Sequence, residues 1–215
     1  MIGTVLMNGL VEYQKTIFDL PERDARNYRL LRDNFVGHNV VIHLAWDTAT
    51  ENWKSGKVNP DNNLMTYNAY QAALESGVRR IVMASSIHAD EFIGWNRDKL
   101  LTPDKIPVPT SPYGASKVFM ESLGRYYAKK YGLEIVCVRF GGVNKDDVIF
   151  PESVEKSYGK VWLSRRDCCA LIRICIESEE IPNNFTIMHG ISDNKGRLHD
   201  ISNLLGWRPV DGYSE

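Results

Sequence analysis

The sequence predicts an α/β fold in which helices cover both faces of a mostly parallel sheet. Apolar stretches of strand length alternate along the chain with longer stretches whose apolar residues recur at helical spacing. The 215 residues are 43% hydrophobic and 25% charged, which is typical of a globular protein with a buried core. We therefore predict one domain over residues 1–215, with a small C-terminal segment from about residue 143 to 215.

The first three predicted elements are short. Residues 3–13 carry apolar side chains at helical spacing and form the first predicted helix. Residues 16–18 combine β-branched and aromatic side chains, so they form a short predicted strand, which Asp19 closes. Residues 24–35 return to helical spacing, and Asp24 is a candidate for the N-cap of this helix.

The next three elements are longer. Residues 39–45 are almost continuously apolar, as expected for a strand that is covered on both faces. Residues 61–75 have helical spacing and end before Gly77, which suits the position after a helix. Residues 80–86 form a second apolar strand, which ends in two serines and precedes a long polar connection.

The last four elements begin with a helix that contains Tyr113. Pro112 suits the first turn of this helix, because a proline lacks an N–H that is not needed there. Residues 134–142 form a predicted strand that runs into a glycine turn. After an irregular region, residues 166–177 are helical and residues 185–189 form a last strand before a glycine.

Tyr113 and Lys117 are the first candidates for catalysis. They are four residues apart, so on a helix they share one face. An ammonium beside a phenol favours the phenolate, and a phenolate can act as a general base toward a hydroxyl group. Taken alone, the pair is better explained as a surface tyrosine and lysine on an ordinary helix, because such a pair is short and common.

Polar or small residues follow several predicted strands. In parallel sheets, ligands bind outside the carboxyl ends of the strands. The residues at these ends are Asp19, Ala45, Ser85, Ser86, Gly141 and Gly142. We therefore expect the candidate chemistry to converge on one edge of the sheet.

Three motifs in this order resemble the extended short-chain dehydrogenase/reductase superfamily, which includes NAD-dependent epimerases and dehydratases. They are Ala84-Ser85-Ser86 at a strand end, Tyr113-Gly114-Ala115-Ser116-Lys117 on a helix, and Arg139-Phe140-Gly141 at the next strand end. The resemblance extends to Leu205-Gly206-Trp207-Arg208-Pro209 near the C terminus. It implies a Rossmann-like doubly wound sheet and an NAD(P)-dependent oxidoreductase, in which a carboxylate at Asp19 on the adenosine ribose would favour NAD over NADP.

The resemblance implies a role for each candidate residue. Tyr113 is the base, Lys117 lowers the pKa of Tyr113 and binds the nicotinamide ribose, and Ser86 orients the reacting oxygen. Asn62 helps to hold the lysine through a water molecule. The residues implied for the cofactor also include Gly3, Asp19, Leu44, Ala45 and Ser85, and those implied for the substrate are Ser86, His88, Gly142 and Lys160. A turn explains Asp19 equally well, and a surface position explains Lys160 equally well.

The C-terminal part of the chain is similar in length to that of uronate dehydrogenase-like members. Only about 75 residues follow Gly141, which leaves little room for a nucleotide-diphosphate pocket. Ile87 and Gly142 stand where uronate dehydrogenases have an asparagine and a serine that bind substrate. The resemblance therefore implies oxidation of a hydroxyl of a sugar or sugar acid, without identifying uronate. The alternatives are a nucleotide-sugar epimerase or dehydratase and a non-catalytic relative.

The start of the chain departs from the pattern of this superfamily. Such folds open with a strand and a glycine-rich loop. Here the chain begins Met1-Ile2-Gly3-Thr4-Val5-Leu6, which resembles the last glycine of that loop and the helix behind it. We expect the first strand and most of the loop to be missing, which leaves a helix N-terminus for the pyrophosphate, and we expect a chain shortened at its N terminus.

Composition excludes several classes of partner. The formal net charge of −1 gives no electrostatic reason to expect nucleic acid or an anionic membrane. No apolar run is long enough to span a bilayer, and the first residues lack the pattern of a signal peptide. The spacing of the four cysteines suggests neither disulfides nor a metal site. We therefore predict a cytoplasmic enzyme with a small-molecule partner, and the resemblance suggests a homodimer through the helix that bears Tyr113.

Overall fold

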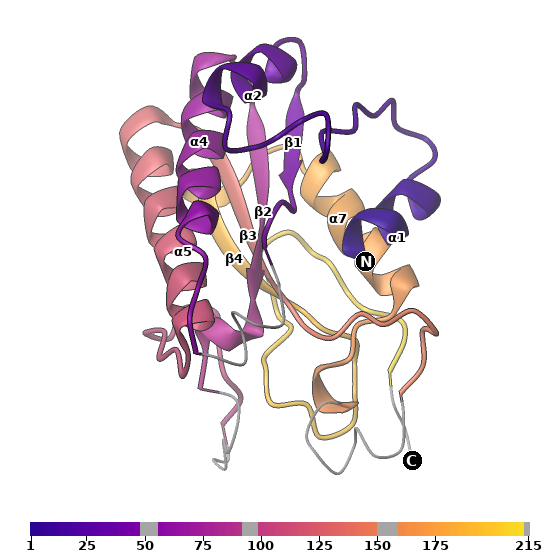
Figure 1. The fold of residues 1–215 in the computed structure, drawn as a ribbon. Coiled ribbons are helices and arrows are strands. Elements are labelled where there is room, and N and C mark those ends of the chain that lie inside the picture. Colours follow the sequence, from indigo (N-terminus) through magenta and orange to yellow (C-terminus); the bar gives the residue numbers. More distant parts are fainter. Residues whose placement is uncertain (48–55, 92–98, 150–158, 213–215) are drawn as a thin grey trace.

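The computed structural model describes residues 1–47, 56–91, 99–149 and 159–212. Four parallel strands form one sheet in the order β1-β2-β3-β4 (Figure 1). The strands are β1 (Val40–His43), β2 (Arg80–Ser86), β3 (Glu134–Phe140) and β4 (Phe185–Gly190). The predicted α/β class and parallel sheet are confirmed.

Helices cover both faces of the sheet (Figure 1). One face carries α2 (Tyr28–Phe35), α4 (Asp61–Glu75) and α5 (Pro112–Tyr131), and the other carries α1 (Ile2–Gly9) and α7 (Arg165–Glu177). Three short 3₁₀ helices complete the set of described helices, namely η1 (Ile87–Ala89), η2 (Gly159–Val161) and η3 (Pro182–Asn184). Among the described helices, none combines the length and apolar character needed to cross a bilayer.

The core has one layer on each side of the sheet. Ile81 and Met83 of β2 pack in the layer beneath α4 and α5, whereas Val82 packs in the layer beneath α1 and α7. Successive side chains of a strand point to opposite faces, so a strand covered on both sides must be apolar at nearly every position. This is why the apolar runs in the sequence identify these strands. The cysteines of α7, at positions 168, 169 and 175, are buried free thiols in the second layer, as expected for core residues.

The strand register brings polar residues together at the carboxyl edge of the sheet. Ser85 of β2 is paired with Arg139 of β3, which is paired with His189 of β4. In the next row, Ser86 is paired with Phe140. Residues that are fifty or more positions apart in the sequence therefore occupy one row across the sheet.

Helix α5 begins where the sequence predicts, because its first turn is capped. The Ser111 hydroxyl accepts a hydrogen bond from the Gly114 N–H at 3.1 Å, and Pro112 occupies the first helical position. Gly132 ends the helix with a φ of 74°, in the left-handed region that glycine adopts readily. These local signals fix the position of Tyr113 at the start of the helix.

Three predictions for the N-terminal region are wrong. Residues 16–18 are not a strand, because no described strand lies beside them to accept their backbone hydrogen bonds, and Ile17 is exposed. Helix α1 ends at Gly9 rather than at residue 13. Helix α2 begins at Tyr28 rather than at Asp24, because the Asn27 side chain caps it by accepting a hydrogen bond from the Leu30 N–H. Strand β1 is also shorter than the predicted range 39–45.

Gly141 and Gly142 provide a matched test of the close approach that follows β3. A Cβ atom at Gly141 would lie 2.0 Å from the carbonyl oxygen of Val161, whereas a Cβ atom at Gly142 would lie 4.0 Å from it. We expect Gly141→Ala to lower the free energy of unfolding by about 1–3 kcal/mol, because backbone must shift, and Gly142→Ala to change it by less than about 0.5 kcal/mol. Urea unfolding measures both values, and equal effects would contradict the packing described here.

Candidate active site

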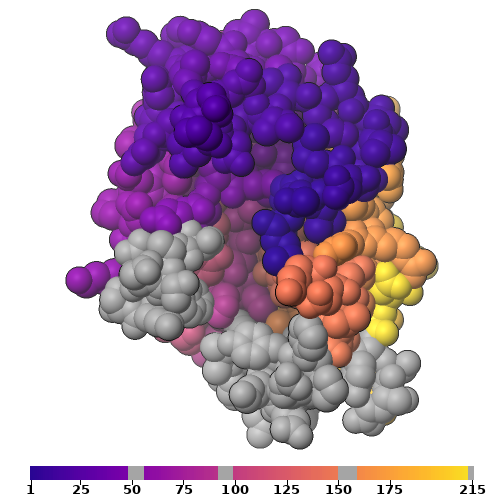
Figure 2. All heavy atoms as spheres, turned by 45° about the vertical axis from the view of Figure 1, so that its right-hand side comes forward, coloured from indigo at the N-terminus to yellow at the C-terminus, as the bar shows by residue number. Residues whose placement is uncertain are grey.

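The candidate site lies at the carboxyl ends of β1 and β2 and at the start of α5. Figure 2 shows a hollow in the surface between the indigo N-terminal segment and the purple part of the chain, and magenta atoms from the middle of the chain lie at its floor. The carboxyl edge of a parallel sheet is where ligands of such folds bind. The residues of this edge therefore form the candidate site.

Ser86, His88 and Tyr113 come together as the sequence predicts. The Ser86 side chain is buried and forms a hydrogen bond with the Tyr113 phenol. It also accepts a hydrogen bond from the His88 N–H at 3.2 Å, and the His88 ring meets the Tyr113 ring edge-on at a centroid distance of 5.7 Å. Gly114 permits this approach of α5 to η1, because a Cβ atom there would lie 2.1 Å from the His88 carbonyl oxygen.

Lys117 is buried one helical turn after Tyr113. Its Nζ donates a hydrogen bond to the Ala84 carbonyl oxygen at 2.7 Å and lies 5.6 Å from the centroid of the Tyr113 ring. The ammonium also lies 3.4 Å from the centroid of the Trp46 ring, which is a close cation–π distance. No role for Trp46 was inferred from the sequence, although its place directly after the end of a predicted strand was a usable signal.

The pKa of Tyr113 is raised by burial, and the hydrogen bond from Ser86 opposes this effect. The expected lowering of this pKa by Lys117 is not seen in this structure. Burial also lowers the pKa of Lys117 well below its ordinary value, because the ammonium is desolvated. Only the charged form of Lys117 favours the Tyr113 phenolate. Groups that stabilise the Lys117 ammonium would therefore also favour the phenolate.

Asn62 is fully buried in the first turn of α4 and holds the chain just after β1. Its Oδ1 accepts a hydrogen bond from the Asp47 N–H at 2.7 Å, and its Nδ2 donates one to the Asp47 carbonyl oxygen at 3.2 Å. The predicted water-mediated contact with Lys117 stays a prediction. What the structure adds is that Asn62 fixes the backbone next to Trp46.

Among the residues implied for the cofactor, Gly3 and Leu44 lie close together. Asp19 lies elsewhere in the chain, outside any described strand. A Cβ atom on Gly3 would lie 3.7 Å from Leu44, so the start of α1 adjoins the end of β1, where Ala45 follows. Asp19 is exposed and does not end a strand, so that part of the prediction is wrong. Its carboxylate accepts a hydrogen bond from the Leu20 N–H at 2.9 Å, as the alternative of a turn aspartate predicts.

Gly142 and Lys160 lie on two segments that are joined by backbone hydrogen bonds. The Gly142 N–H donates to the Val161 carbonyl oxygen at 2.8 Å, and the Gly142 carbonyl oxygen accepts from the Leu163 N–H at 2.9 Å. Lys160 lies in η2, and its Cε is 3.7 Å from the position of a Cβ atom on Gly196. Their predicted role in substrate binding stays a prediction.

A buried ionic network lies behind the serines. Ser85 donates a hydrogen bond to Glu121 Oε1 at 2.6 Å, and its predicted contact with the cofactor stays a prediction. Arg139 donates to both oxygens of Glu121, at 2.8 and 2.7 Å, and to both oxygens of Asp90, at 3.0 and 2.9 Å. The sequence contained Arg139 as part of a motif, but the two carboxylates that it binds were not predicted.

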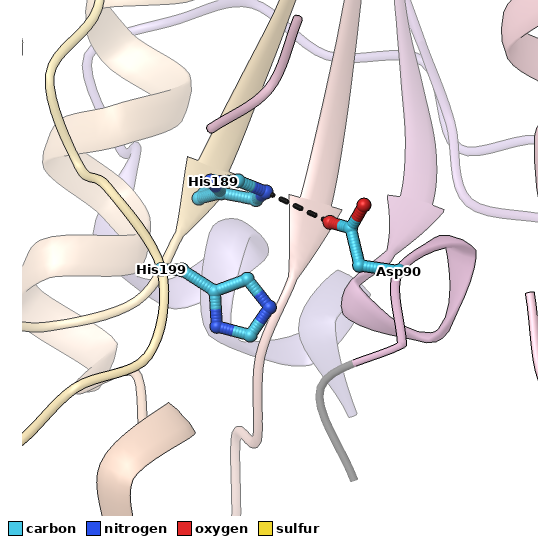
Figure 3. A group of neighbouring side chains, drawn as sticks. All are labelled: Asp90, His189 and His199. Atoms are coloured by element: carbon cyan, nitrogen blue, oxygen red, sulfur yellow. Dashed lines mark hydrogen bonds and ion pairs between the residues drawn. The ribbon is translucent and has the colours of Figure 1, made fainter. Parts of the chain in front are cut away.

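Asp90, His189 and His199 form a group whose ligand atoms lie within 4.8 Å of one another (Figure 3). These types of residue can hold a metal ion, and all three are buried. The Asp90 carboxylate already receives the Arg139 guanidinium, and His189 faces two acceptors, Asp90 Oδ2 at 3.1 Å and the Asp200 carbonyl oxygen at 2.8 Å. A divalent cation here would be repelled by the positive charge of Arg139. We therefore interpret Asp90, His189 and His199 as the end of the ionic network rather than as a metal site.

The chain is similar to several known proteins. The sequence profile described as the NAD dependent epimerase/dehydratase family matches residues 10–143. L-arabinose 1-dehydrogenase (NAD(P)(+)) of Haloferax volcanii is 33% identical over 214 residues, which cover 87% of this chain and 80% of that protein. NAD-dependent glucose-6-phosphate dehydrogenase of the same organism is 32% identical, over 89% of this chain and 76% of that protein.

The fold is similar to that of a solved structure. A mutated uronate dehydrogenase superposes with a TM-score of 0.78 at 26% identity, over 98% of this chain and 78% of that one. The predicted Rossmann-like fold and the predicted likeness to uronate dehydrogenases are therefore confirmed. The relatives named here are all dehydrogenases of sugars, sugar phosphates or sugar acids.

Proposed function

The chain belongs to the NAD-dependent epimerase/dehydratase family, and from this premise we propose that it is an NAD-dependent dehydrogenase that oxidises a hydroxyl group of a small sugar or sugar acid. The observation that supports it most directly is the hydrogen bond between Ser86 and Tyr113, with Lys117 one turn farther along α5. The named activities of the relatives support the substrate class, since all of them act on sugars or their derivatives.

The residues present fit a nicotinamide dinucleotide. Lys117 is a buried cation, and among the described residues its Nζ has one hydrogen bond, so it retains donors for ribose hydroxyls. Gly3 and Ala45 are small residues at a helix start and a strand end, where a backbone can approach a pyrophosphate closely. We propose NAD before NADP, and the printed names of the relatives support this order, since one is NAD-dependent and one is described with NAD(P)(+).

We propose the following division of roles. The cofactor supplies the hydride acceptor. Tyr113, as the phenolate, takes the proton of the substrate hydroxyl, and Ser86 donates a hydrogen bond that orients the same oxygen. Lys117 binds the ribose and, when its ammonium is charged, favours the phenolate. His88, which lies against Tyr113, forms part of the wall toward the substrate.

Titration calorimetry with NAD and NADP tests the cofactor, and a panel of aldoses and sugar acids, scored by formation of reduced nicotinamide, tests the reaction. We expect NAD to bind more tightly than NADP and at least one aldose or sugar acid to be oxidised. Retained NAD that appears only on denaturation, without net oxidation of any sugar, would contradict the dehydrogenase and favour an epimerase or dehydratase.

Ser86→Ala tests the orienting hydroxyl. We expect kcat to fall about 10²-fold, because one hydrogen-bond donor to the reacting oxygen is removed, while the Kd for NAD changes less than about twofold. Ser122→Ala, at an exposed position of the same helix as Tyr113, is the matched control and should leave kcat unchanged. Equal kcat values for the two variants would contradict the role of Ser86.

We further propose a cytoplasmic homodimer of a single-domain chain. Four free buried thiols suit a reducing compartment. The outer faces of α4 and α5 carry exposed large apolar side chains, which suit a helical contact between two copies. These side chains are Leu64, Tyr67, Phe119, Tyr126 and Tyr131. Sedimentation analysis tests this proposal, and a monomer at every concentration would contradict it.

A further inference from the structure

The Trp46 ring lies against the ammonium of Lys117, the residue that the proposed function assigns to the cofactor ribose. Trp46 lies three residues after the end of β1, and the centroid of its ring is 3.4 Å from Lys117 Nζ. It also meets the Tyr113 ring edge-on at a centroid distance of 6.2 Å. One aromatic side chain therefore contacts both members of the Tyr-x-x-x-Lys pair.

Two polar groups remain poorly satisfied in this arrangement. The Trp46 indole N–H is buried without a hydrogen-bond partner among the described residues. Lys117 is buried and, within the part of the chain that the structure describes, makes one hydrogen bond, to the Ala84 carbonyl oxygen, while the Trp46 ring lies where further acceptors could stand. Buried donors without acceptors are unfavourable, so this arrangement is open to replacement by a ligand that offers hydroxyl oxygens.

From this geometry we propose that the Trp46 indole is a built-in competitor for Lys117, which the nicotinamide riboside half of the cofactor must displace in order to bind. The inference rests on the proposed function, since it assigns the ribose hydroxyls to Lys117. Trp46 thereby sets the affinity for the complete dinucleotide and leaves the adenosine half unaffected.

The movement is confined to the side chain. Asn62 makes two hydrogen bonds to the backbone of Asp47, at 2.7 and 3.2 Å, and this holds the chain beside Trp46 in place. The indole therefore leaves Lys117 by changing rotamer. Once it has left, the ribose hydroxyls accept hydrogen bonds from the ammonium, and the charged form of Lys117 is favoured beside Tyr113.

Calorimetric titration with NAD and with ADP tests the competition. ADP is the adenosine half of the cofactor and lacks the riboside that contacts Lys117. For Trp46→Leu we expect the Kd for NAD to fall about tenfold, because a desolvated cation–π contact is lost from the free state only, and the Kd for ADP to stay within twofold. Trp46→Phe should lie between this variant and the wild type, because phenylalanine is a weaker cation–π partner.

Fluorine NMR on the wild-type chain gives a second readout that does not depend on a variant of altered stability. In protein labelled with 5-fluorotryptophan, the resonance that Trp46→Phe removes belongs to Trp46. We expect this resonance to move when NAD is added and to stay in place when ADP is added. Trp207→Phe is the control for assignment, because Trp207 is buried in the second core layer away from Lys117.

The outcomes separate the two proposals. Weaker binding of NAD to Trp46→Leu, or a Trp46 resonance that NAD does not move, would overturn the competition while the dehydrogenase stands if a sugar is oxidised. Tighter binding of NAD to Trp46→Leu without oxidation of any sugar would support the competition and overturn the dehydrogenase. If wild type and variants bind neither NAD nor NADP, both are overturned.

Discussion

Tyr113→Phe should lower kcat by about 10³-fold, within the range of general acid–base catalysis. The substitution removes only the phenol oxygen, which is the proposed base and the partner of Ser86. The ring keeps its edge contacts with Trp46 and His88, so the fold and the Kd for NAD should be preserved. Steady-state kinetics and calorimetric titration measure the two quantities on one preparation.

Tyr126→Phe is the matched control for this substitution. Tyr126 lies on the same helix and is exposed, so the loss of its oxygen should leave kcat unchanged. Turnover by Tyr113→Phe equal to that of the control would show that another group takes the proton. A large increase in the Kd for NAD together with the loss of turnover would instead place Tyr113 in binding.

Arg139→Met should lower the free energy of unfolding by about 3–5 kcal/mol. The Arg139 guanidinium is buried between the carboxylates of Glu121 and Asp90, and its removal leaves two buried negative charges without their partner. Urea unfolding followed by circular dichroism measures this change. Arg139→Lys should recover part of the loss, because it keeps the charge and loses the paired hydrogen bonds.

The control for Arg139→Met is Arg166→Met. Arg166 pairs with Asp211 at the surface, where water and salt screen the charges, so we expect a change close to experimental error. Similar losses in the two variants would contradict the buried network. Because Ser85 donates to Glu121, we also expect Arg139→Met to disturb the strand end that presents Ser86.

Much of the fold follows from signals that lie close together in the sequence. Strand β2 and helix α4 have the predicted bounds, because an unbroken apolar run and a helical period depend only on neighbouring residues. The start of α5 was predictable from Pro112, and it places Tyr113 and Lys117 on one helical face. The order of the motifs was also enough to identify the family.

The errors and omissions concern partners that are distant in the sequence. A strand over residues 16–18 needs a neighbouring backbone, and no local pattern reports whether one is present. The contact between the Trp46 indole and Lys117 joins residues 71 positions apart. The hydrogen bonds from Arg139 to Asp90 join residues 49 positions apart, and both contacts arise through tertiary packing alone. The sequence by itself determined which residues could carry the chemistry. Only the tertiary structure decided which of them touch, because the packing of distant elements brings the partners together. The same packing buries these groups and thereby shifts their pKa values.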